Sequence, residues 1–336
     1  MANANPNANP DATTTPRTPL TRLAAEIAAL LREDPRRVVL GEDVADGGML
    51  GLTRDCREDE ALAPRLLSLP LTPAATIAHA AGLAMAGRRP LVILPSATAL
   101  LDGFSGLREL CRLSGSAGGE RSGAVVMIAP TGPGFGLGGD GAASPEDVLA
   151  ALPGLRVICL GDARESVAIL RAVAEFDAGE QPTLLLLPRA LVLREVDDFI
   201  PVARPLGGAK VVRRGEQATV FAWGATLDNA LAAAAASEAD GISVAVVDVG
   251  GLSPLDADTL AAAAARTGKL VIAHPGQRSA VAAEVAALLA DRALLHLDAP
   301  ILRVGGAAGP AVYTAEADVL PSVAALVAAI HEVVTF

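Results

Sequence analysis

Short apolar segments alternate with segments of helical periodicity along most of the chain, and this alternation constrains the fold more than any other feature. The runs "PLVILP" at 90–95 and "TLLLLP" at 183–188 are apolar on both faces. The segment "LTRLAAEIAALLRED" from Leu20 has helical spacing, with Thr21 as its expected N-cap. Strands that are apolar on both faces are typical of parallel sheets that helices cover on both sides. The sequence therefore predicts an α/β protein with mainly parallel sheets.

The alternation occurs in two sets, which we interpret as two α/β domains at 20–196 and 211–336. The segment between them, "DDFIPVARPLGGAK" at 197–210, contains two prolines and a glycine pair and is expected to be a linker. Residues 1–19 are polar and proline-rich, so we expect a disordered tail, whose repeated "NANP" leaves open whether it is native or an added tag. The expected strands are 36–44, 90–95, 123–130, 155–161, 183–188, 218–224, 242–249, 269–274 and 300–306, and the expected helices are 20–34, 74–86, 101–113, 145–152, 164–176, 226–237, 255–266, 279–290 and 320–332.

The charge of the chain argues against anionic partners. The formal net charge is -11, and binding to nucleic acid or to an anionic membrane needs clustered lysine and arginine. Aromatic residues are only 2% of the chain, which leaves few side chains on which bases or sugars can stack. We therefore expect neither a nucleic acid nor a membrane as a partner.

Cysteine usage and hydropathy bear on the cellular compartment. Cys56, Cys111 and Cys159 lie far apart, which fits neither a disulfide framework nor a CxxC metal motif. No uninterrupted apolar run reaches the ~18 residues of a membrane span, and no basic start precedes an apolar stretch. The sequence favours a location in the reducing cytoplasm.

A glycine-rich segment after one expected strand has the spacing of a dinucleotide-binding loop, with glycines at 134, 136 and 139. The context argues against this function, because the next helix is expected to begin later, with a capping box of Ser144 and Asp147 and with Pro145 at its first position. Glu146 and Asp147 in the first turn already complement the helix dipole and would repel a phosphate. We do not expect a nicotinamide or flavin cofactor.

The four histidines have no spacing that indicates a metal site, so we expect no zinc. His79 lies in an apolar helix and is expected to be a core histidine. His274 ends a strand, where open α/β sheets bind ligands, so it is a candidate catalytic residue, with a structural role as an equal alternative. Glu42 follows another strand, and either lies in a solvated turn or faces a cleft as an acid.

Four segments follow one another along the chain: "VVLGEDV" at 38–44, "PLTPAATIAHAAGLAMAGRRPLV" at 70–92, "SPEDVLAALPGLRVI" at 144–158 and "SPLDADTLAAAAARTGKLVIAH" at 253–274. In this order they resemble landmarks of one family, the beta subunits of the thiamine-diphosphate-dependent 2-oxoacid dehydrogenase first component, which correspond to the middle and C-terminal domains of transketolase. The resemblance implies a pyrimidine-binding domain followed by a transketolase C-terminal-like domain, over about Leu20 to Phe336. It also implies an alpha-type partner that supplies the diphosphate and magnesium site, and self-association of the beta-type subunit.

The same resemblance shows departures at the positions that face the cofactor. Where the family has "PLSEAG", with a glutamate that protonates the aminopyrimidine ring, this chain has "PLTPAA", with Pro73 after Leu71 and Thr72. Ser96 and Ala99 replace aromatic residues that stack on the ring. Further substituted positions are Gly141 for a histidine, Ile93 and Thr98 for acids, Pro95 for a glutamine, Gly250 for an arginine and Pro275 for a glutamate, whereas Glu42 and His274 are retained.

Three functions fit this pattern. The first is a beta-type subunit that is divergent or catalytically depleted, completes an assembly with its partner and is not active alone; it shares thiamine diphosphate and magnesium with that partner or has lost them. The second is an active two-carbon or acyl transferase whose missing groups come from the partner. The third is a non-enzymatic scaffold or ligand-binding protein. Because one general acid-base group contributes ~10² to 10⁴ in rate, loss of the whole set favours the first.

Overall fold

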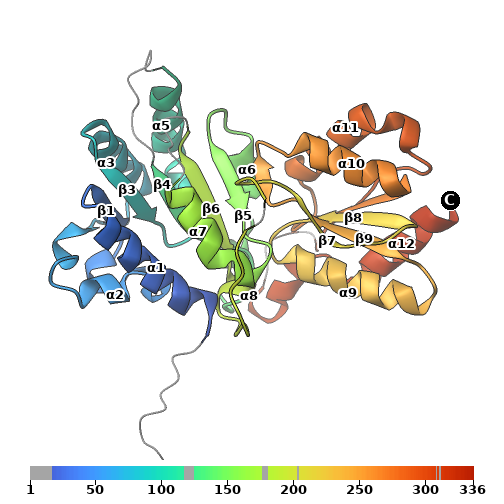
Figure 1. Ribbon diagram of the computed structural model, residues 1–336, viewed down its shortest axis with the longest axis horizontal. Coiled ribbons are helices and arrows are strands. Elements are labelled where there is room, and N and C mark those ends of the chain that lie inside the picture. The colour runs from blue at the N-terminus through green and yellow to red at the C-terminus, as the bar shows by residue number, and fades with distance from the viewer. Residues whose placement is uncertain (1–16, 117–124, 176–180, 203, 308, 310–311) are drawn as a thin grey trace, which may run out of the picture.

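The structure is a computed structural model that describes residues 17–116, 125–175, 181–202, 204–307, 309 and 312–336. It contains two sheets side by side, each with helices on both faces, so the predicted α/β class is confirmed (Figure 1). Most of the predicted tail lies outside the described residues. Its end, however, is helical, because the first helix begins at Pro19.

The first sheet has seven strands in the order β10-β5-β6-β4-β3-β1-β2. All neighbours are parallel except β10, which pairs antiparallel with β5. Its central strands are buried at every position, as expected for a sheet covered on both faces. The strands are β1 Arg37–Gly41, β2 Leu66–Ser68, β3 Arg89–Ile93, β4 Val126–Thr131, β5 Arg156–Cys159, β6 Thr183–Pro188 and β10 Gly251–Ser253.

The second sheet has five strands in the order β12-β11-β8-β9-β7. Only β7 runs antiparallel, at the edge beside β9. Neither β7 nor β10 was expected from the sequence. The strands are β7 Lys210–Arg213, β8 Ala218–Ala222, β9 Val244–Asp248, β11 Leu270–Ala273 and β12 Leu302–Val304.

The helices begin and end at residues suited to those positions. Asp256 caps α10 by accepting a hydrogen bond from Thr259 N, and the helix ends at Gly268 with φ +64°, a conformation that glycine adopts without strain. The helices are α1 Pro19–Glu33, α2 Arg54–Arg57, α3 Pro73–Met85, α4 Ala99–Asp102, α5 Phe104–Ser116, α6 Glu146–Ala150, α7 Ser166–Glu175, α8 Arg189–Val192, α9 Thr226–Ala239, α10 Ala257–Thr267, α11 Ala280–Arg292 and α12 Val323–Thr335.

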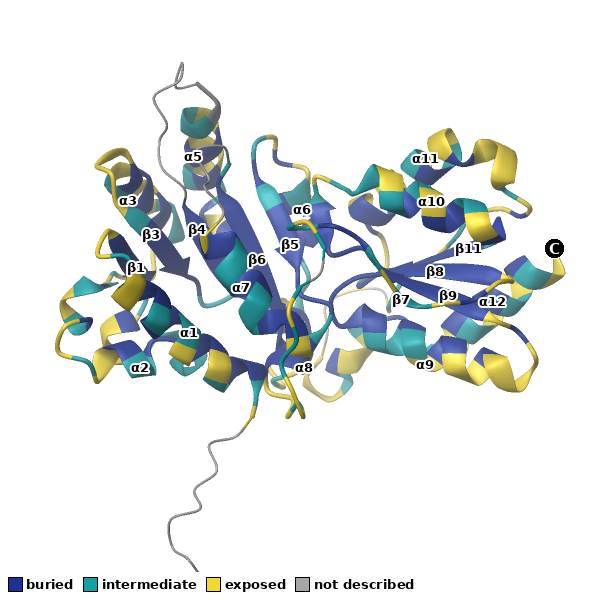
Figure 2. Cartoon of the chain, in the orientation of Figure 1, coloured by how far each residue is buried: buried dark blue, intermediate teal, exposed yellow. Residues whose placement is uncertain are grey.

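Three hydrophobic clusters hold these layers together. One lies between the first sheet and α1 and α7, and another between the second sheet and α9 and α12. The third cluster spans both domains, because it joins the side chains of α3, α5 and α6 to those of α10 and α11. Figure 2 shows the buried strands at the centre, with exposed residues on the outer faces of the helices. The two halves of the chain therefore share part of their core.

Two local expectations were wrong. Thr18 rather than Thr21 caps α1, since its hydroxyl accepts a hydrogen bond from Thr21 N at 3.3 Å. The single helix expected at 101–113 is two helices, α4 and α5, which meet at Gly103. A Cβ at Gly103 would lie 2.9 Å from the Cβ of Pro73, so a glycine at this break allows the start of α3 to pack closely against it.

One stretch among the described residues, Tyr313–Thr335, is long and apolar enough by length and composition to cross a membrane. It consists of a 3-10 segment, Tyr313–Val319, followed by α12. Leu326, Ile330 and Val333 of α12 are buried against the second sheet. This packing accounts for the apolar face of α12.

Candidate functional site

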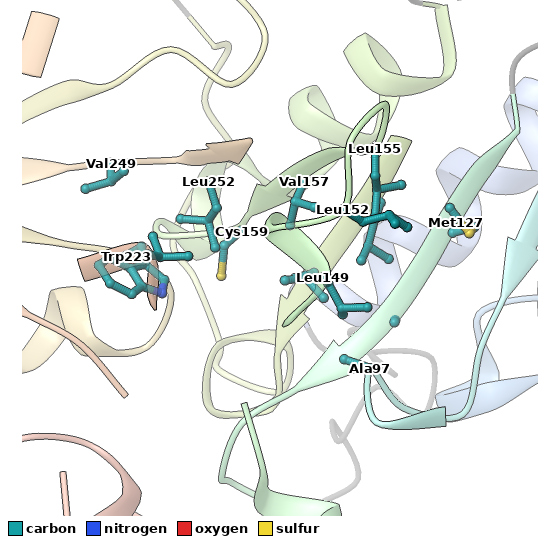
Figure 3. Packing of buried hydrophobic residues seen from close by; sticks show 14 of the residues in the cluster. Ala97, Met127, Leu149, Leu152, Leu155, Val157, Cys159, Trp223, Val249 and Leu252 are labelled. Carbon is teal, nitrogen blue, oxygen red and sulfur yellow. The ribbon is translucent and has the colours of Figure 1, made fainter. Parts of the chain in front are cut away.

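The two sheets meet at the carboxyl ends of β5 and β9, in a region that we call the interdomain seam: Cys159–Gly161, Trp223–Gly224 and Asp248–Gly250. Cys159 N donates a hydrogen bond to Gly250 O at 2.9 Å. A Cβ at Gly224 would lie 2.8 Å from Cys159 Sγ, so only glycine allows this approach. Figure 3 shows Trp223 beside Cys159 at this meeting point. The carboxyl ends of open α/β sheets are where ligands bind, so the seam and the neighbouring strand ends are the candidate site.

The predicted cofactor positions lie near the start of α3, in a region that we call the α3 corner: Leu71–Pro73, Ser96 and Ala99. The structure brings these residues together, because Pro73 packs against Gly103 at the end of α4, which begins at Ala99. Ser96 Oγ accepts a hydrogen bond from Ala99 N at 3.2 Å. Leu71 is 57% exposed, so its side chain lies on the surface.

The polar chemistry of the α3 corner consists of hydroxyl groups. Ser96 Oγ and Thr98 Oγ1 are 2.7 Å apart, and Thr72 Oγ1 donates to Pro70 O at 3.2 Å. Thr72 precedes α3 without capping it by a side-chain hydrogen bond. An aliphatic hydroxyl group donates and accepts hydrogen bonds but does not ionise near neutral pH. The corner can therefore orient a ligand but cannot act as a general acid.

The other two candidates on the first sheet follow strands β1 and β4, which β3 separates. Glu42 follows β1, half-buried, and β1 is in register with β3 so that Gly41 faces Ile93. Glu42 thus lies at the same sheet edge as the chain that leads from β3 to Ser96. Gly141 lies in a turn after β4, where an added Cβ would lie 2.4 Å from the Cβ of Leu137. Leu137 thus occupies the space that a side chain at 141 would need.

The histidines do not gather at the α3 corner. His274 is buried at the end of β11, where its Nδ1 lies 3.1 Å from Pro275 O. Burial lowers its pKa, so the ring is neutral near pH 7. His79 is exposed on α3, so the expectation of a core histidine was wrong, because α3 buries its opposite face. His296 is exposed, and His331 Nε2 lies 3.2 Å from Asp240 Oδ2. The described residues contain no group of three or more histidine, cysteine or acidic side chains placed to hold a metal ion.

The glycine-rich loop binds an anion that belongs to the chain itself. The backbone N–H groups of Gly134, Gly136 and Gly138 donate to the carboxylate of Glu316 at 3.0, 2.9 and 2.6 Å. These glycines have φ of +140°, +65° and +61°, which turns successive N–H groups toward one point. The loop thus has the geometry of an anion site, as its spacing indicates, but a carboxylate from the second domain occupies it.

The surroundings of Glu316 keep it ionised. Burial alone would raise the pKa of Glu316, but the N–H groups of Gly134, Gly138 and Gly136 outweigh it and lower that pKa. Arg189, also buried, donates to Gly132 O at 3.0 Å and lies over the ring of Phe135. Sequence reasoning missed Glu316, and the only signal was the run of alternating glycines, which indicates a backbone with positive φ.

The expected capping box before α6 was wrong. Pro145 precedes α6, and no side chain caps the helix. Asp147 instead accepts hydrogen bonds from Ser279 Oγ at 2.7 Å and Val281 N at 2.9 Å, at the start of α11. Glu146 is buried rather than solvated in the first turn. Asp147 therefore serves a contact between the domains, whereas Glu146 accepts a hydrogen bond from Thr131 within the first domain.

A buried ion cluster also crosses the seam. Arg204 Nη2 lies 2.9 Å from Glu165 Oε2 and 2.9 Å from Asp248 Oδ2, and Lys210 Nζ lies 2.6 Å from Glu165 Oε1. Both carboxylate side chains are 1% exposed. Arg204 lies in the predicted linker, so part of that segment is packed between the domains. Burial raises the pKa of Asp248, an effect that Arg204 opposes.

Comparisons with known proteins agree with this architecture. Two family models match the chain: the transketolase pyrimidine binding domain over residues 20–194 and the transketolase C-terminal domain over residues 207–326. The pyruvate dehydrogenase E1 component subunit beta of Leifsonia xyli subsp. xyli is 32% identical over 84% of this chain and 84% of its own length. The mitochondrial 2-oxoisovalerate dehydrogenase subunit beta of Dictyostelium discoideum is 32% identical over 82% of this chain and 75% of its own. A solved structure, titled a split gene transketolase in an inactive beta4 tetramer, has a TM-score of 0.73 at 24% identity and covers 95% of this chain and 98% of that one.

The fold and the matched domains define the class as transketolase-like, with a pyrimidine-binding domain before a C-terminal domain. Within this class, the chain belongs to the family of E1 beta-type subunits of the 2-oxoacid dehydrogenases. The resemblance stated from the sequence is thereby confirmed. The family depends on thiamine diphosphate, and its beta subunits pair with alpha subunits. The roles of the individual site residues stay predictions, as do the domain boundaries.

The residues of the α3 corner do not fit the chemistry that the family performs on the aminopyrimidine ring. That chemistry needs an acid beside the ring, and the corner offers Pro73 and hydroxyl groups. Gly141, the counterpart of the family histidine, is closed off by Leu137. We therefore derive no catalytic step through the cofactor on this chain.

Proposed function

We propose that this chain is a catalytically depleted beta-type subunit of a two-component thiamine-diphosphate enzyme, which acts by completing an assembly with an alpha-type partner. The observation that carries the proposal is the start of α3. Pro73, which has no proton to donate, stands there and packs against Gly103. An added Cβ at Gly106 would lie 2.7 Å from Ala74 O, so the first turn of α3 is held closely by α5. A framework that is kept while its reactive groups are replaced favours an architectural role.

The outer face of α3 supports the assembly part of the proposal. Ala75, Ala78, Gly82 and Met85 are exposed on it, and Met85 is 63% exposed. Small apolar residues on one helix face allow the backbone of another helix to approach closely, and obligate interfaces commonly bury more than about 2,000 Å² in total. We propose that this face takes part in self-association of the beta-type subunit or in pairing with the alpha-type subunit.

The cofactor and location belong to the same proposal. If the assembly binds thiamine diphosphate, we expect the alpha-type subunit to supply the magnesium and diphosphate contacts. The three cysteines of this chain are free and buried, which suits a cytoplasmic protein.

Restoring the missing groups tests the proposal. The chain is mixed with an alpha-type subunit of the family, and binding of thiamine diphosphate with magnesium is measured by calorimetry. Pro73→Glu with Ala99→Phe is expected to raise the affinity, because one aromatic contact is worth about 0.5 to 1.5 kcal/mol, roughly 2- to 10-fold. Pro73→Gln with Ala99→Phe is the matched control, since it supplies the same bulk without the acid. Catalytic turnover is expected in neither variant, since the other substituted positions, such as Gly141, remain.

The outcomes separate the three functions. Tight cofactor binding and turnover of a 2-oxo acid or a ketose by the unmodified pair would contradict depletion and favour an active transferase. A stable assembly of this chain alone that binds none of the alpha-type subunits tested would favour a scaffold or a ligand-binding protein. Sedimentation of the same mixtures measures which assembly forms.

A further inference from the structure

A small cavity lies in the seam between the two sheets, away from the α3 corner. Its volume, counted as space for the centre of a water-sized sphere, is about 10 Å³. That is close to the minimum of about 10 to 15 Å³ that one water molecule needs on this measure. The lining comes from both domains and includes Thr131, Glu146, Trp223, Thr226, Pro275 and Leu320.

Three buried polar atoms of this lining have no hydrogen-bond partner among the described residues: Glu146 Oε2, Trp223 Nε1 and Thr226 Oγ1. Their residues are 4%, 1% and 0% exposed. Buried polar groups in folded proteins are nearly always paired, with protein or with ordered water. All three atoms belong to residues that line this one cavity, which makes a shared ligand the simplest partner for them.

The chemistry of the three atoms selects that ligand. The indole N–H of Trp223 only donates, the hydroxyl of Thr226 donates or accepts, and the carboxyl group of Glu146 accepts and, when protonated, also donates. Water has two hydrogens and two lone pairs, so it complements all three at once. The size of one water molecule also matches the volume of the cavity.

We propose that this cavity is a binding site for one water molecule, which accepts a hydrogen bond from Trp223 Nε1 and links Thr226 Oγ1 to the carboxyl group of Glu146 across the domain seam. The site joins α6 of the first domain to the end of β8 and the start of α9 in the second. It makes the contact between the domains sensitive to the protonation of one carboxyl group.

The groups that face Glu146 explain this sensitivity. Burial, together with the nearby charge of Asp147, raises the pKa of Glu146 to about 7, although hydrogen bonds from its own backbone N–H and from Thr131 oppose the rise. Thr131 Oγ1, at 3.4 Å, is the one described side chain that donates to it. From β5, the Cys159 thiol stays protonated because burial raises its pKa well above 9. On the remaining sides, Asp248 of β9 is paired with Arg204, and His274 at the end of β11 is neutral.

The chain carries its own reporter, since Trp223 is its single tryptophan. Fluorescence of the full chain is measured from pH 5 to pH 9. We expect one transition with a midpoint near pH 7, which is lost in Glu146→Gln and kept in the matched control Glu284→Gln, an exposed acid on the neighbouring α11. A flat titration of the unmodified chain, or a transition that persists unchanged in Glu146→Gln, would overturn the proton-linked contact.

A second variant keeps the test decisive if Glu146→Gln does not fold. Thr226→Val keeps the shape of the side chain and removes one partner of the water. It is expected to raise the midpoint by at least about half a pH unit, because the ionised carboxylate loses hydrogen bonding. A crystal structure at pH 5.5 is expected to place one water within about 2.7 to 3.2 Å of the three atoms. Direct contact of Trp223 Nε1 with Glu146 and no water would overturn the site.

Discussion

Glu316 shows how one side chain can change the use of a motif. The glycine-rich loop has the backbone geometry of a phosphate cradle, but its N–H groups donate to a carboxylate that the second domain supplies. An external anion would have to displace a group that is covalently tethered to the same chain. The loop therefore stabilises the contact between the domains.

We predict that Glu316→Gln lowers the free energy of unfolding by about 2 kcal/mol at pH 7, because hydrogen bonds to a charged acceptor are worth about 1.5 to 3 kcal/mol. The effect depends on pH. Since the folded-state pKa lies below the ordinary value, the contribution is full above about pH 4.5 and is lost as the pH falls through the folded pKa.

Denaturant unfolding of the unmodified chain and of Glu316→Gln at pH 7 and at pH 4 measures this difference. Glu332→Gln, an exposed change on α12, is the control and is expected to stay within about 0.5 kcal/mol. A Glu316→Gln effect that is the same at both pH values would contradict the role of the charge.

Residue roles were the least predictable part of the site. The sequence correctly places Glu42 and His274 at strand ends, because strand ends follow from hydropathy. It misplaces His79, since the apolar face of α3 continues around the helix as exposed alanines and gives no sign of which side is buried. It also misassigns Ser144 and Asp147, because a capping motif has the same letters as a side chain that reaches another helix.

At the scale of elements, close approach between backbones depends on glycine. Gly224 has φ +56°, and a Cβ added there would lie 2.8 Å from Cys159 Sγ. Gly241 has φ +78°, and a Cβ added there would have no neighbouring atom of the described residues within 4 Å. Both positions strain an L residue, but only the first is also crowded.

We predict that Gly241→Ala costs about 1 to 2 kcal/mol of unfolding free energy, from backbone conformation alone. Gly224→Ala is expected to cost about 1 to 3 kcal/mol more, because the added methyl group overpacks the seam. Thermal and denaturant unfolding of the two variants measures the difference. Equal losses of unfolding free energy in the two variants would mean that the seam accommodates the added methyl group without strain.

Most of the alternating strands and helices could be predicted, including short ones such as β12 and α6. The signal is the alternation itself, in which buried strands such as β6, with four leucines in six residues, are separated by helical segments. β7 and β10 could not be predicted, because β7 is half-exposed and β10 consists of three residues that begin with glycine. Their positions depend on partners that are distant in sequence, which no local pattern contains.

At the scale of the whole molecule, the buried ion cluster couples the two domains. Arg204 neutralises Glu165 and Asp248, which come from different domains and are both nearly inaccessible to water. Removing one partner of a buried pair leaves charge that is not compensated.

We predict that Arg204→Met lowers the unfolding free energy by about 3 to 5 kcal/mol at pH 7, and that part of the loss is regained at lower pH as Asp248, whose pKa burial raises, accepts a proton. Calorimetry is expected to show a single transition at a lower temperature, since the domains still share part of their core. Arg213→Met is the matched control, because it breaks an exposed pair with Glu238 and is expected to cost no more than about 1 kcal/mol. Equal losses for the two variants would contradict the coupling.

β10 belongs to the second domain by sequence and to the first sheet by hydrogen bonding. Separating the two domains within 197–210 would remove β10 from β5. β5 would then be an exposed edge strand, which is a template for aggregation. A first domain produced without the second would therefore lack three residues that complete its own sheet.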